Sequence, residues 1–403
     1  MIKRFIFNRL VDELKQPEIN ILLGARQVGK TTLLRALEDH VKRSHAPTAF
    51  FDLEQPQVLA EFNRSDAEIL EKLSKAGKVV FIDEFQYLQN ASKLFKALFD
   101  ARHGVKLICS GSSSLEIHKH LKESLAGRRF LFRIFPLQFS EILAHDPRFS
   151  LETYLRYGGM PALTGTNSEE RKEQILSELL SAYILKDVKS LVREENIRAF
   201  NHLFYLLAEN QGSVLSVYSL AREIGMSSKA VNRYLEILEQ TFVNFKVFSY
   251  STRLGNELKK SCKTYFYDLG IRNALLKDFS KVSDRPDKGI LSESFVFLKL
   301  QTFLKPNTEL KFWRTKDGDE VDFILLVNRK PLPIEVKGKL STLEIPKGLR
   351  RFLLRYPKTQ KAWVISENQK GTLLQDATSV SFLTLESFAQ SENLATLDKT
   401  KAE

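Results

Sequence analysis

The sequence predicts an α/β protein, and three features of the chain lead to that fold class. Short apolar runs alternate with helical stretches through residues 1–150, as expected for a parallel sheet whose strands are joined by helices. Residues 151–250 have helical spacing, and residues 256–403 return to mixed strands and helices. With 403 residues, of which 43% are hydrophobic, the chain is long enough for roughly two or three domains.

The first predicted domain, residues 1–150, alternates strand and helix along its length. Its predicted strands are Ile19–Leu23, Thr48–Leu53, Lys78–Ile82, Val105–Ser110 and Phe130–Phe135. Its clearest predicted helices are Thr31–His40 and Ser92–Ala101. We therefore expect a parallel sheet with helices packed against it.

Three further parts follow. Residues 151–200 are predicted to be a helical lid or linker. In residues 201–255, helices over Leu215–Ile224 and Ser228–Gln240 flank a glycine-containing turn and precede a β-ribbon, a pattern typical of a winged helix-turn-helix. Residues 256–403 are predicted to form a second α/β domain, with a helix over Gly289–Phe303 and strands at Thr264–Tyr267, Lys311–Arg314, Val321–Val327, Leu332–Val336 and Ala362–Ile365.

The charge balance favours an anionic partner. The chain carries 61 basic and 49 acidic residues, a net charge of +12, and residues 251–403 carry 27 basic and 19 acidic groups, a net charge of +8. Such an excess is typical of proteins that bind nucleic acid, although ordinary solubility charge explains it equally well. DNA is the partner that we expect.

The composition also excludes several classes of protein. No apolar run approaches the ~18 residues of a membrane-spanning helix, and charges return too soon after Met1 for a signal peptide. The two cysteines, Cys109 and Cys262, are too few for a disulfide framework or a four-cysteine metal site. We expect a cytoplasmic protein with no membrane partner.

Residues Gly24–Thr31 match the phosphate-binding motif G-x-x-x-x-G-K-[ST] without a mismatch. The motif follows a predicted strand and precedes a predicted helix, so its backbone N–H groups and the helix N-terminus point at phosphates. We expect Lys30 to reach the terminal phosphates of ATP and to face solvent without ligand, and Thr31 to coordinate Mg²⁺. The residues expected to hold the nucleotide are Gly24, Ala25, Arg26, Gln27, Val28, Gly29, Lys30, Thr31, Thr32 and Asp83.

Two carboxylates follow the apolar strand Lys78–Ile82. Asp83 and Glu84 come at its carboxyl end, the edge where open α/β sheets bind ligands. We expect Asp83 to hold Mg²⁺ and Glu84 to orient or deprotonate the attacking water. Alone, two charges after a strand would be unremarkable surface residues, but the neighbouring phosphate motif favours catalysis.

Further candidates for phosphate chemistry follow the next strand. In the loop Ser110–Ser114, Ser112 is the predicted contact to the γ-phosphate or the attacking water, with Ser110 as the alternative. Arg128, or its neighbour Arg129, is predicted to stabilise phosphate charge in cis or from a neighbouring subunit. The structural alternatives are a serine loop that bonds its own backbone and a solvated arginine pair.

The C-terminal domain holds a second group of charged residues in a predicted hairpin. A turn over Asn328–Pro331, centred between residues 329 and 330, places Asp322 opposite Lys337 and Ile324 opposite Glu335. Side chains two apart share a face of a strand, so Asp322, Glu335 and Lys337 are expected to converge.

These residues suit the chemistry of a metal-dependent nuclease. Asp322 and Glu335 can hold Mg²⁺ through their oxygens, Lys337 can assist beside the metal, and Glu293, on the predicted helix Gly289–Phe303, can add a carboxylate. The alternative is a salt bridge between Asp322 and Lys337. A carboxylate within the apolar run Pro333–Val336 favours the functional interpretation, because burying it without a partner is costly.

The motifs together resemble a widespread prokaryotic family of AAA-type ATPases whose C-terminal domain of unknown function is related to the PD-(D/E)XK nuclease fold. Gly24–Thr31 is similar to the Walker A loop and Val79–Glu84 to the Walker B strand. The other segments that resemble the family are Leu125–Arg128, Pro136–Glu141, Tyr157–Pro161, Lys263–Gly270, Phe312–Arg314, Glu320–Asp322 and Ile334–Lys337. The resemblance implies ATP and Mg²⁺ as cofactors and a nuclease-like fold over residues 256–403, but no settled substrate.

Three functions remain open at this point. The first is a DNA-associated ATPase with a nuclease-like C-terminal domain. The second is a nucleotide-dependent switch whose inactive nuclease fold only binds DNA or protein, and the third is an ATP-dependent DNA nuclease. Glu84 favours hydrolysis over a pure switch. A homo-oligomer is compatible with an arginine-bearing ATPase domain but is not required by it.

Overall fold

The computed structural model describes residues 2–101, 104–112, 125–183, 197–251, 262–392 and 394. The chain divides into two compact units. The first consists of residues 1–137, 160–162 and 236–243, and the second of residues 138–159, 163–235 and 244–403. The division predicted at residues 150, 200 and 255 stays a prediction.

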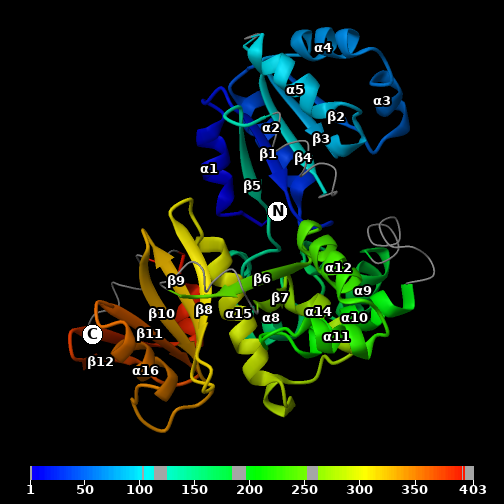
Figure 1. Ribbon diagram of the computed structural model, residues 1–403. Helices are drawn as coiled ribbons and strands as arrows, with labels where there is room; N and C mark the ends of the chain where they lie inside the picture. Colours follow the sequence, from blue (N-terminus) through cyan, green and yellow to red (C-terminus); the bar gives the residue numbers. More distant parts are fainter. Residues whose placement is uncertain are drawn as a thin grey trace. The chain divides into compact units, whose positions relative to one another are not determined.

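The first unit contains a five-stranded sheet in which all strands run parallel (Figure 1). The strands are β1 (Ile19–Leu23), β2 (Thr48–Asp52), β3 (Val79–Asp83), β4 (Lys106–Gly111) and β5 (Arg129–Arg133). Their order in the sheet is β2-β3-β4-β1-β5. Every residue of β1, β3 and β4 is buried, which explains why these strands are nearly continuous apolar runs. The predicted N-terminal parallel sheet is confirmed.

Helices of the first unit connect these strands and cover the sheet. They are α1 (Ile6–Glu13), α2 (Lys30–Arg43), α3 (Pro56–Glu61), α4 (Asp66–Lys75), the short η1 (Phe85–Tyr87) and α5 (Ala91–Asp100). Helix α2 packs on β2, β3 and β4 through its buried leucines, among them Leu33, Leu34 and Leu37. This packing holds the start of α2 at the carboxyl edge of the sheet.

The second unit begins with helices, as the sequence predicts for the middle of the chain. They are α7 (Phe139–His145), α8 (Leu151–Tyr157), η2 (Pro161–Leu163), α9 (Glu169–Tyr183), α10 (Ile197–Glu209), α11 (Val217–Glu223), α12 (Ser228–Gln240) and α14 (Leu269–Leu276). Two of them cross the division between the units, since residues 160–162 and 236–243 belong to the first. Helices α11 and α12 flank Gly225, whose φ of +69° suits the predicted turn.

Two segments of the second unit that are far apart in sequence meet at Asp268. Its carboxylate accepts hydrogen bonds from the backbone N–H groups of Gly159, at 2.8 Å, and of Ile271, at 3.0 Å, and so caps α14. A Cβ at Gly158 would lie 2.2 Å from an oxygen of this carboxylate. Glycine at 158 is therefore needed for the two segments to approach.

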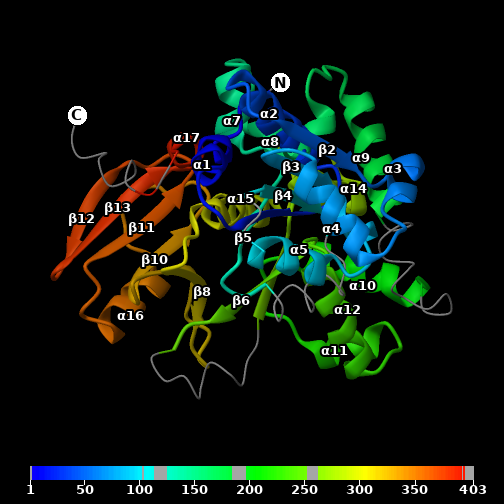
Figure 2. The same ribbon diagram turned by 90° about the horizontal axis from the view of Figure 1, so that it is seen from above.

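The second unit also contains a mixed sheet of eight strands, ordered β12-β13-β11-β10-β9-β8-β6-β7 (Figure 2). The strands are β6 (Asn244–Ser249), β7 (Cys262–Phe266), β8 (Thr308–Arg314), β9 (Glu320–Val327), β10 (Lys330–Val336), β11 (Lys361–Ser366), β12 (Gly371–Gln375) and β13 (Thr378–Thr384). The helical elements beside it are η5 (Val282–Asp284), α15 (Lys288–Phe303), α16 (Lys347–Arg355) and α17 (Leu385–Gln390).

Strands β6, β12 and β13 of this sheet depart from the expectations. Strand β6 follows α12 where a β-ribbon is expected within residues 201–255, but it pairs with β8 and with β7, which corresponds to the separately predicted strand Thr264–Tyr267, so it belongs to the larger sheet. Strands β12 and β13 are not among the predicted ones. In β12 no residue is fully buried, so its sequence lacks the apolar pattern from which strands are recognised.

Helices α15 and α16 pack on opposite faces of β9. Phe297 of α15 lies against Phe323, and Phe352 of α16 belongs to a buried cluster with Ile324. Neighbouring residues of a strand point to opposite faces, so the two helices enclose the sheet. Both faces of β9 are therefore core, which accounts for its run of apolar residues.

Candidate functional site

The loop Gly24–Gly29 connects β1 to α2 and lies close to another backbone segment. A Cβ at Gly24 would lie 2.2 Å from the carbonyl oxygen of Ile134, so a larger residue does not fit there. Gly29 is the residue before α2 and has φ +93°, a left-handed conformation that glycine adopts without strain. Both glycines of the phosphate motif thus have conformational or spatial reasons for their positions.

Arg4 also supports this loop, a role that the sequence does not predict. Its guanidinium donates hydrogen bonds to the carbonyl oxygen of Val28, at 3.1 Å, and to that of Phe135, at 2.7 Å. The arginine therefore ties the phosphate loop to the chain that follows β5. Nothing in the local sequence around Arg4 signals this role, because its partners lie 24 and 131 residues away.

Lys30 lies inside the loop, and this corrects the expectation that its side chain faces solvent. It is only 4% exposed, and its ammonium donates to the carbonyl oxygens of Gly24, at 3.0 Å, and Ala25, at 2.8 Å. The reason is the curvature of the loop, which turns these two carbonyls toward the ammonium. The positive charge is therefore held at the place where the motif predicts phosphate.

Asp83 is buried at the carboxyl end of β3, within reach of the phosphate loop. It is 2% exposed, and hydroxyl groups of Ser110 and Thr31 hydrogen-bond to its carboxylate. Burial raises the pKa of Asp83 above its usual value, and these two hydrogen bonds oppose that rise. The structure thus brings together Thr31 and Asp83, the two residues predicted to hold Mg²⁺.

Glu84 follows in a left-handed conformation, with φ 52°. Its carboxylate accepts hydrogen bonds from the side-chain amide of Gln86 and from the backbone N–H of Ser112, the latter at 3.3 Å. The hydroxyl of Ser112 also lies 3.3 Å from this carboxylate. Gln86, which holds the Glu84 carboxylate, is not among the predicted site residues. Its position two residues after Glu84 is the sequence feature from which it could have been predicted. Ser113 and Ser114, the rest of the predicted serine loop, lie outside the described residues.

Arg128 is not brought to this group of residues within the chain. Its guanidinium pairs with Asp100, with Nε 2.7 Å from Oδ1. The next residue, Arg129, is paired with Ile19 at the start of β1, so this arginine pair lies at the amino edge of the sheet. The phosphate loop leaves the other end of β1, about 13 Å away along a five-residue strand. A contribution from a neighbouring subunit stays a prediction.

The residues at the carboxyl edge fit a nucleoside triphosphate with Mg²⁺. The backbone cradle at Gly24 is too tight for a side chain, and the buried Lys30 ammonium suits phosphate oxygens. The carboxylate of Asp83 and the hydroxyl of Thr31 form an oxygen-donor pair of the kind that Mg²⁺ prefers.

In the C-terminal hairpin the structure corrects the predicted register. Lys330 pairs with Val327 and Pro333 with Ile324, so the centre of the hairpin lies between residues 328 and 329. Continued to residue 322, this register places Asp322 opposite Glu335 rather than opposite Lys337. The loop has only two residues, Asn328 and Arg329, with φ of 50° and 65°, as in a type I′ turn. The prediction assigned four residues to the turn and so shifted its centre by one residue.

The predicted carboxylates nevertheless converge, and a buried lysine lies among them. The ammonium of Lys263, on β7, lies 3.1 Å from Glu293, 2.5 Å from Glu320 and 3.9 Å from Asp322. Its side chain is 1% exposed. Lys337 pairs with Glu335 at 2.7 Å instead of with Asp322. We call Lys263, Glu293, Glu320, Asp322, Glu335 and Lys337 the carboxylate cluster.

The electrostatics of the carboxylate cluster follow from burial and like charges. Burial, followed by the charge of Asp322, raises the pKa of Glu293 to about 7 and that of Glu335 to about 8. Burial alone would lower the pKa of Lys263, but the neighbouring carboxylates raise it. Across the described ranges, no group of three or more His, Cys, Asp or Glu side chains is arranged to hold a metal ion.

Comparison with known protein families assigns a domain to each part of the chain. Residues 16–143 match a model described as an AAA domain. The N-terminal part of the chain carries an AAA domain. Residues 148–282 and 288–387 match two models described as domains of unknown function, DUF8612 and DUF4143. An AAA domain indicates that the chain binds a nucleoside triphosphate, for which Mg²⁺ is the usual companion.

Uncharacterized relatives match most of the chain at modest identity. An uncharacterized protein of Methanocaldococcus jannaschii is 29% identical over 377 residues, which cover 87% of this chain and 81% of the relative. One of Mycobacterium tuberculosis is 27% identical over 351 residues, covering 86% and 76%. A solved structure of the replication initiator DnaA, bound to AMPPCP and single-stranded DNA, is 14% identical, covers 60% of this chain and 90% of DnaA, and superposes with a TM-score of 0.32, too low to indicate function.

The remaining predictions concern membrane-spanning helices and the relation of the C-terminal part to nucleases. Of the helices in the described residues, none is long and apolar enough to span a membrane. The description matched by residues 288–387 assigns them no activity, so the relation of this part to nucleases stays a prediction.

Proposed function

We propose that the AAA domain of this protein binds and hydrolyses Mg-ATP, using Gly24–Thr32, Asp83 and Glu84. One observation carries the proposal: Glu84, the predicted base, directly follows the carboxylate that bonds the Thr31 hydroxyl. The three elements that an ATPase needs, a phosphate cradle, a magnesium site and a base for water, thus meet at one edge of one sheet.

Each side chain has a distinct part in this proposal. Lys30 would exchange the carbonyl oxygens of Gly24 and Ala25 for phosphate oxygens, which are stronger acceptors for an ammonium. Thr31 and Asp83 would hold Mg²⁺, which neutralises charge on the phosphates when bound. Glu84 would orient the attacking water or accept its proton.

Ser112 acts in this proposal as a positioning residue. The backbone N–H and the hydroxyl of Ser112 both lie 3.3 Å from Oε2 of Glu84, and the amide of Gln86 donates to the Ser112 hydroxyl at 3.0 Å. These contacts fix the direction of the Glu84 carboxylate. A direct contact of Ser112 to the γ-phosphate, as predicted, would require the same hydroxyl to leave Glu84 and Gln86.

Substitution of Glu84 tests the proposed hydrolysis. Glu84→Gln keeps the shape of the side chain but removes the basic oxygen, so ATP still binds while turnover falls by about 10²–10⁴-fold. Glu54→Gln, at an exposed glutamate of the same unit, serves as the matched control and leaves turnover unchanged. Turnover of Glu84→Gln within a few-fold of wild type would contradict the assignment of the base.

We further propose that DNA is the partner of this ATPase. The supporting observations are the net charge of +8 over residues 251–403 and the exposed Lys229 and Arg233, which share one face of α12 four residues apart. ATP turnover measured with and without DNA separates an ATPase stimulated by DNA from a slow nucleotide switch. Salt-independent DNA binding, or none at low salt, would favour a protein partner instead.

The carboxylate cluster supports a second candidate function, metal-dependent cleavage of DNA. The favourable observation is that Asp322 and Glu335 are neighbours on paired strands, with Lys337 beside Glu335. The opposing observation is that Lys263 already forms ion pairs with three of the carboxylates. If these ion pairs are purely structural, the carboxylate cluster is an internal ion network, and the C-terminal domain only binds DNA or protein.

Metal linkage distinguishes the two cases. If Asp322 and Glu335 hold a metal, Mn²⁺ at a hundredfold excess over its Kd stabilises the protein by about 2.7 kcal/mol. The measurement uses the Lys30→Ala protein without nucleotide, so that the phosphate loop contributes little. Asp322→Asn with Glu335→Gln then abolishes the shift and any cleavage. A melting temperature that does not change with Mn²⁺, together with DNA that stays uncleaved, would exclude metal-dependent DNA cleavage by this cluster.

A further inference from the structure

A pocket of about 980 Å³ opens beside the turn of the β9–β10 hairpin in the second unit. Its walls are the turn region 327–332 and the segment 355–361, which connects α16 to β11, together with Tyr250. Along β9 the turn lies six residues from Asp322, or about 20 Å at the rise of an extended strand. The pocket is therefore separate from the carboxylate cluster.

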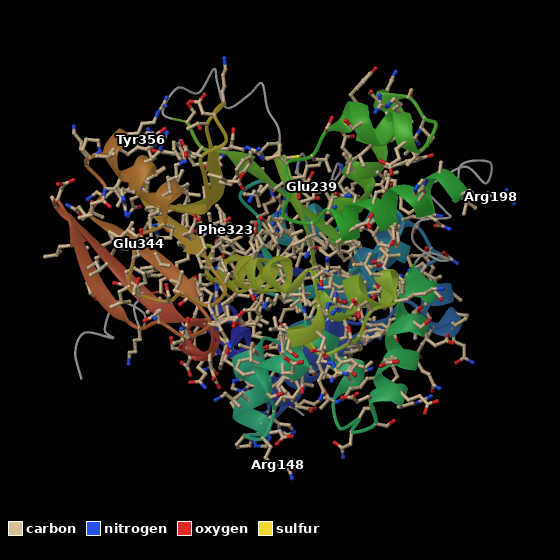
Figure 3. All side chains as sticks on the ribbon, turned by 90° about the horizontal axis from the view of Figure 1, so that it is seen from below. Arg148, Arg198, Glu239, Phe323, Glu344 and Tyr356 are labelled. Atoms are coloured by element: carbon tan, nitrogen blue, oxygen red, sulfur yellow. The ribbon has the colours of Figure 1, made fainter. Side chains whose placement is uncertain are left out.

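The pocket has an aromatic and apolar lining. The rings of Tyr250 and Tyr356 lie 5.3 Å apart at an angle of 58°. Tyr356 packs in turn on Phe352, with ring centroids 4.5 Å apart, and so is held by the core beneath it. Figure 3 shows Tyr356 beside α16, at the margin of the packed side chains, whereas Phe323 lies among them. Both tyrosines are half-buried, which leaves part of each ring accessible.

The residues around this lining are strongly basic. Five of the lining residues are cationic: Arg329, Lys330, Arg355, Lys358 and Lys361. All five are exposed, and no lining residue is an aspartate or glutamate. Within the part of the chain that the structure describes, Lys330 and Lys358 have no ion pair. The pocket thus combines flat apolar surface with a concentrated positive charge.

One residue of the pocket wall is almost completely buried. Thr359 lines the pocket and is only 2% exposed. Its hydroxyl has no hydrogen-bond partner among the described residues, although its backbone is well bonded, with the carbonyl accepting from Thr378 at 2.7 Å. The hydroxyl oxygen is itself shielded from solvent, so it lies behind the pocket surface and is not a contact for a ligand.

We propose that this pocket binds single-stranded nucleic acid, with bases stacked on the two tyrosines and phosphates held by the surrounding cations. Stacking on aromatic rings combined with a basic groove is how proteins hold unpaired strands. The bases of a duplex are stacked on each other and do not enter such a pocket. An acidic peptide would match the charge but would make no use of the aromatic lining. This inference rests on the proposed DNA association and adds to it a binding site and the single-stranded form of the ligand.

The test measures binding of a fluorescently labelled oligo(dT) to the full chain, without nucleotide, by fluorescence anisotropy over a range of salt. Lys330→Ser with Lys358→Ser removes two exposed pocket cations. The matched control, Lys339→Ser with Lys370→Ser, removes two exposed lysines of the second unit that do not line the pocket. The pocket variant lowers the log–log salt slope by about 1.4, since each contact to a single strand contributes about 0.7. The control variant retains the wild-type slope and affinity.

A second comparison tests the stacking. An abasic oligonucleotide of the same length keeps the phosphates but lacks the bases, so it binds at least about fivefold more weakly than oligo(dT). Polyglutamate at the same charge concentration fails to displace oligo(dT).

Three results would overturn the proposal: equal slopes for the pocket and control variants, equal affinity for the abasic strand, or displacement by polyglutamate. If wild type and pocket variant both bind DNA equally well, the DNA association survives and the pocket assignment fails. If wild type binds no oligo(dT) at low salt but binds a duplex of the same length, only the pocket assignment fails; if it binds neither, both proposals fail.

Discussion

The ammonium of Lys263, on β7, lies 3.1 Å from the carboxylate of Glu293, on α15, although the two residues are thirty positions apart in the sequence. The hydroxyl of Tyr265 donates to the same carboxylate at 2.5 Å. The side chain of Lys263 is 1% exposed, so this charge has left water almost completely. Such a group is stable only because its carboxylate partners surround it.

Replacing Lys263 is therefore expected to destabilise the second unit strongly. Lys263→Met keeps the length of the side chain but leaves Glu293, Glu320 and Asp322 without their shared cation. Breaking a buried ion pair on one side costs about 3–5 kcal/mol of unfolding free energy. Denaturant unfolding measures the loss, and Lys339→Met, at an exposed lysine of the same unit, is the control. A loss as small as that of the control would show that the cluster does not depend on Lys263.

Asp268 makes the stability of the second unit depend on pH. Burial, opposed by hydrogen bonds from the backbone, raises the pKa of Asp268 to about 6. The carboxyl of Asp268 therefore binds a proton more tightly in the folded state than in the unfolded state, where its pKa is about 3.8. The stability that the protonated group contributes is lost as pH rises from about 3.8 to about 6.

The non-titrating variant Asp268→Asn isolates this effect. Its unfolding free energy is lower than that of wild type at pH 4, because an amide cannot accept from both Gly159 and Ile271 as the carboxyl does. The difference in unfolding free energy between the two proteins narrows by about 2 kcal/mol between pH 4 and pH 6, which is most of the total expected for a pKa shift of roughly two units at about 1.4 kcal/mol per unit. Asp376→Asn, at an exposed turn residue, should follow wild type throughout. A pH-independent difference would mean that Asp268 does not titrate in this range.

Lys30→Ala tests the phosphate loop itself. The ammonium is held inside the loop by Gly24 and Ala25, so its removal leaves the phosphates without their principal cation. ATP binding weakens, and turnover falls by about 10²–10³-fold, as for the loss of one preorganised donor. Lys42→Ala removes an exposed lysine from the same helix and leaves both unchanged. Calorimetric titration with ATP and a phosphate-release assay measure the two effects; normal values for Lys30→Ala would exclude this loop as the nucleotide site.

Asp287 holds two buried arginines and is expected to be important for stability. Its carboxylate lies 2.7 Å from Nη1 of Arg272 and 2.8 Å from Nε of Arg285, and both arginine side chains are 1% exposed. Burial alone would raise the pKa of Asp287, but the hydrogen bonds from the arginines lower it to about 2. The carboxylate therefore stabilises the fold above its unfolded pKa of about 3.8, and this contribution disappears as pH falls toward 2.

Asp287→Asn removes the countercharge and is expected to cost about 3–5 kcal/mol at neutral pH. The control is Asp284→Asn, an exposed residue three positions earlier. Thermal unfolding at pH 7 compares the two variants. Equal melting temperatures would indicate that Asp278, whose carboxylate is 3.6 Å from Arg285, neutralises the arginines instead.

The sequence by itself determined the features that depend on neighbouring residues. The strands of the first sheet lie within two residues of their predicted positions, and in the buried strands β1, β3 and β4 the reason is that a buried parallel strand is a continuous apolar run. The phosphate loop, Asp83 and Glu84 were recognisable for the same reason, since each motif is contiguous and its flanking strand is local. The helices on both sides of Gly225 were likewise predicted from their spacing and turn.

Only the tertiary structure decided which distant residues meet. Arg4 bonds to Val28, Lys263 to Glu293 and Asp268 to Gly159 across 24, 30 and 109 residues, and no local pattern specifies such pairs. The hairpin register depended on left-handed backbone at Asn328 and Arg329, which shortens the turn to two residues. As a result Glu335, and not Lys337 as predicted, lies opposite Asp322. The position of Arg128 at the amino edge of its sheet follows from strand direction, a property of the assembled sheet rather than of any segment. Local sequence specifies the elements, whereas contacts between them are set by packing over the whole unit, where burial and charge pairing decide which arrangement is stable.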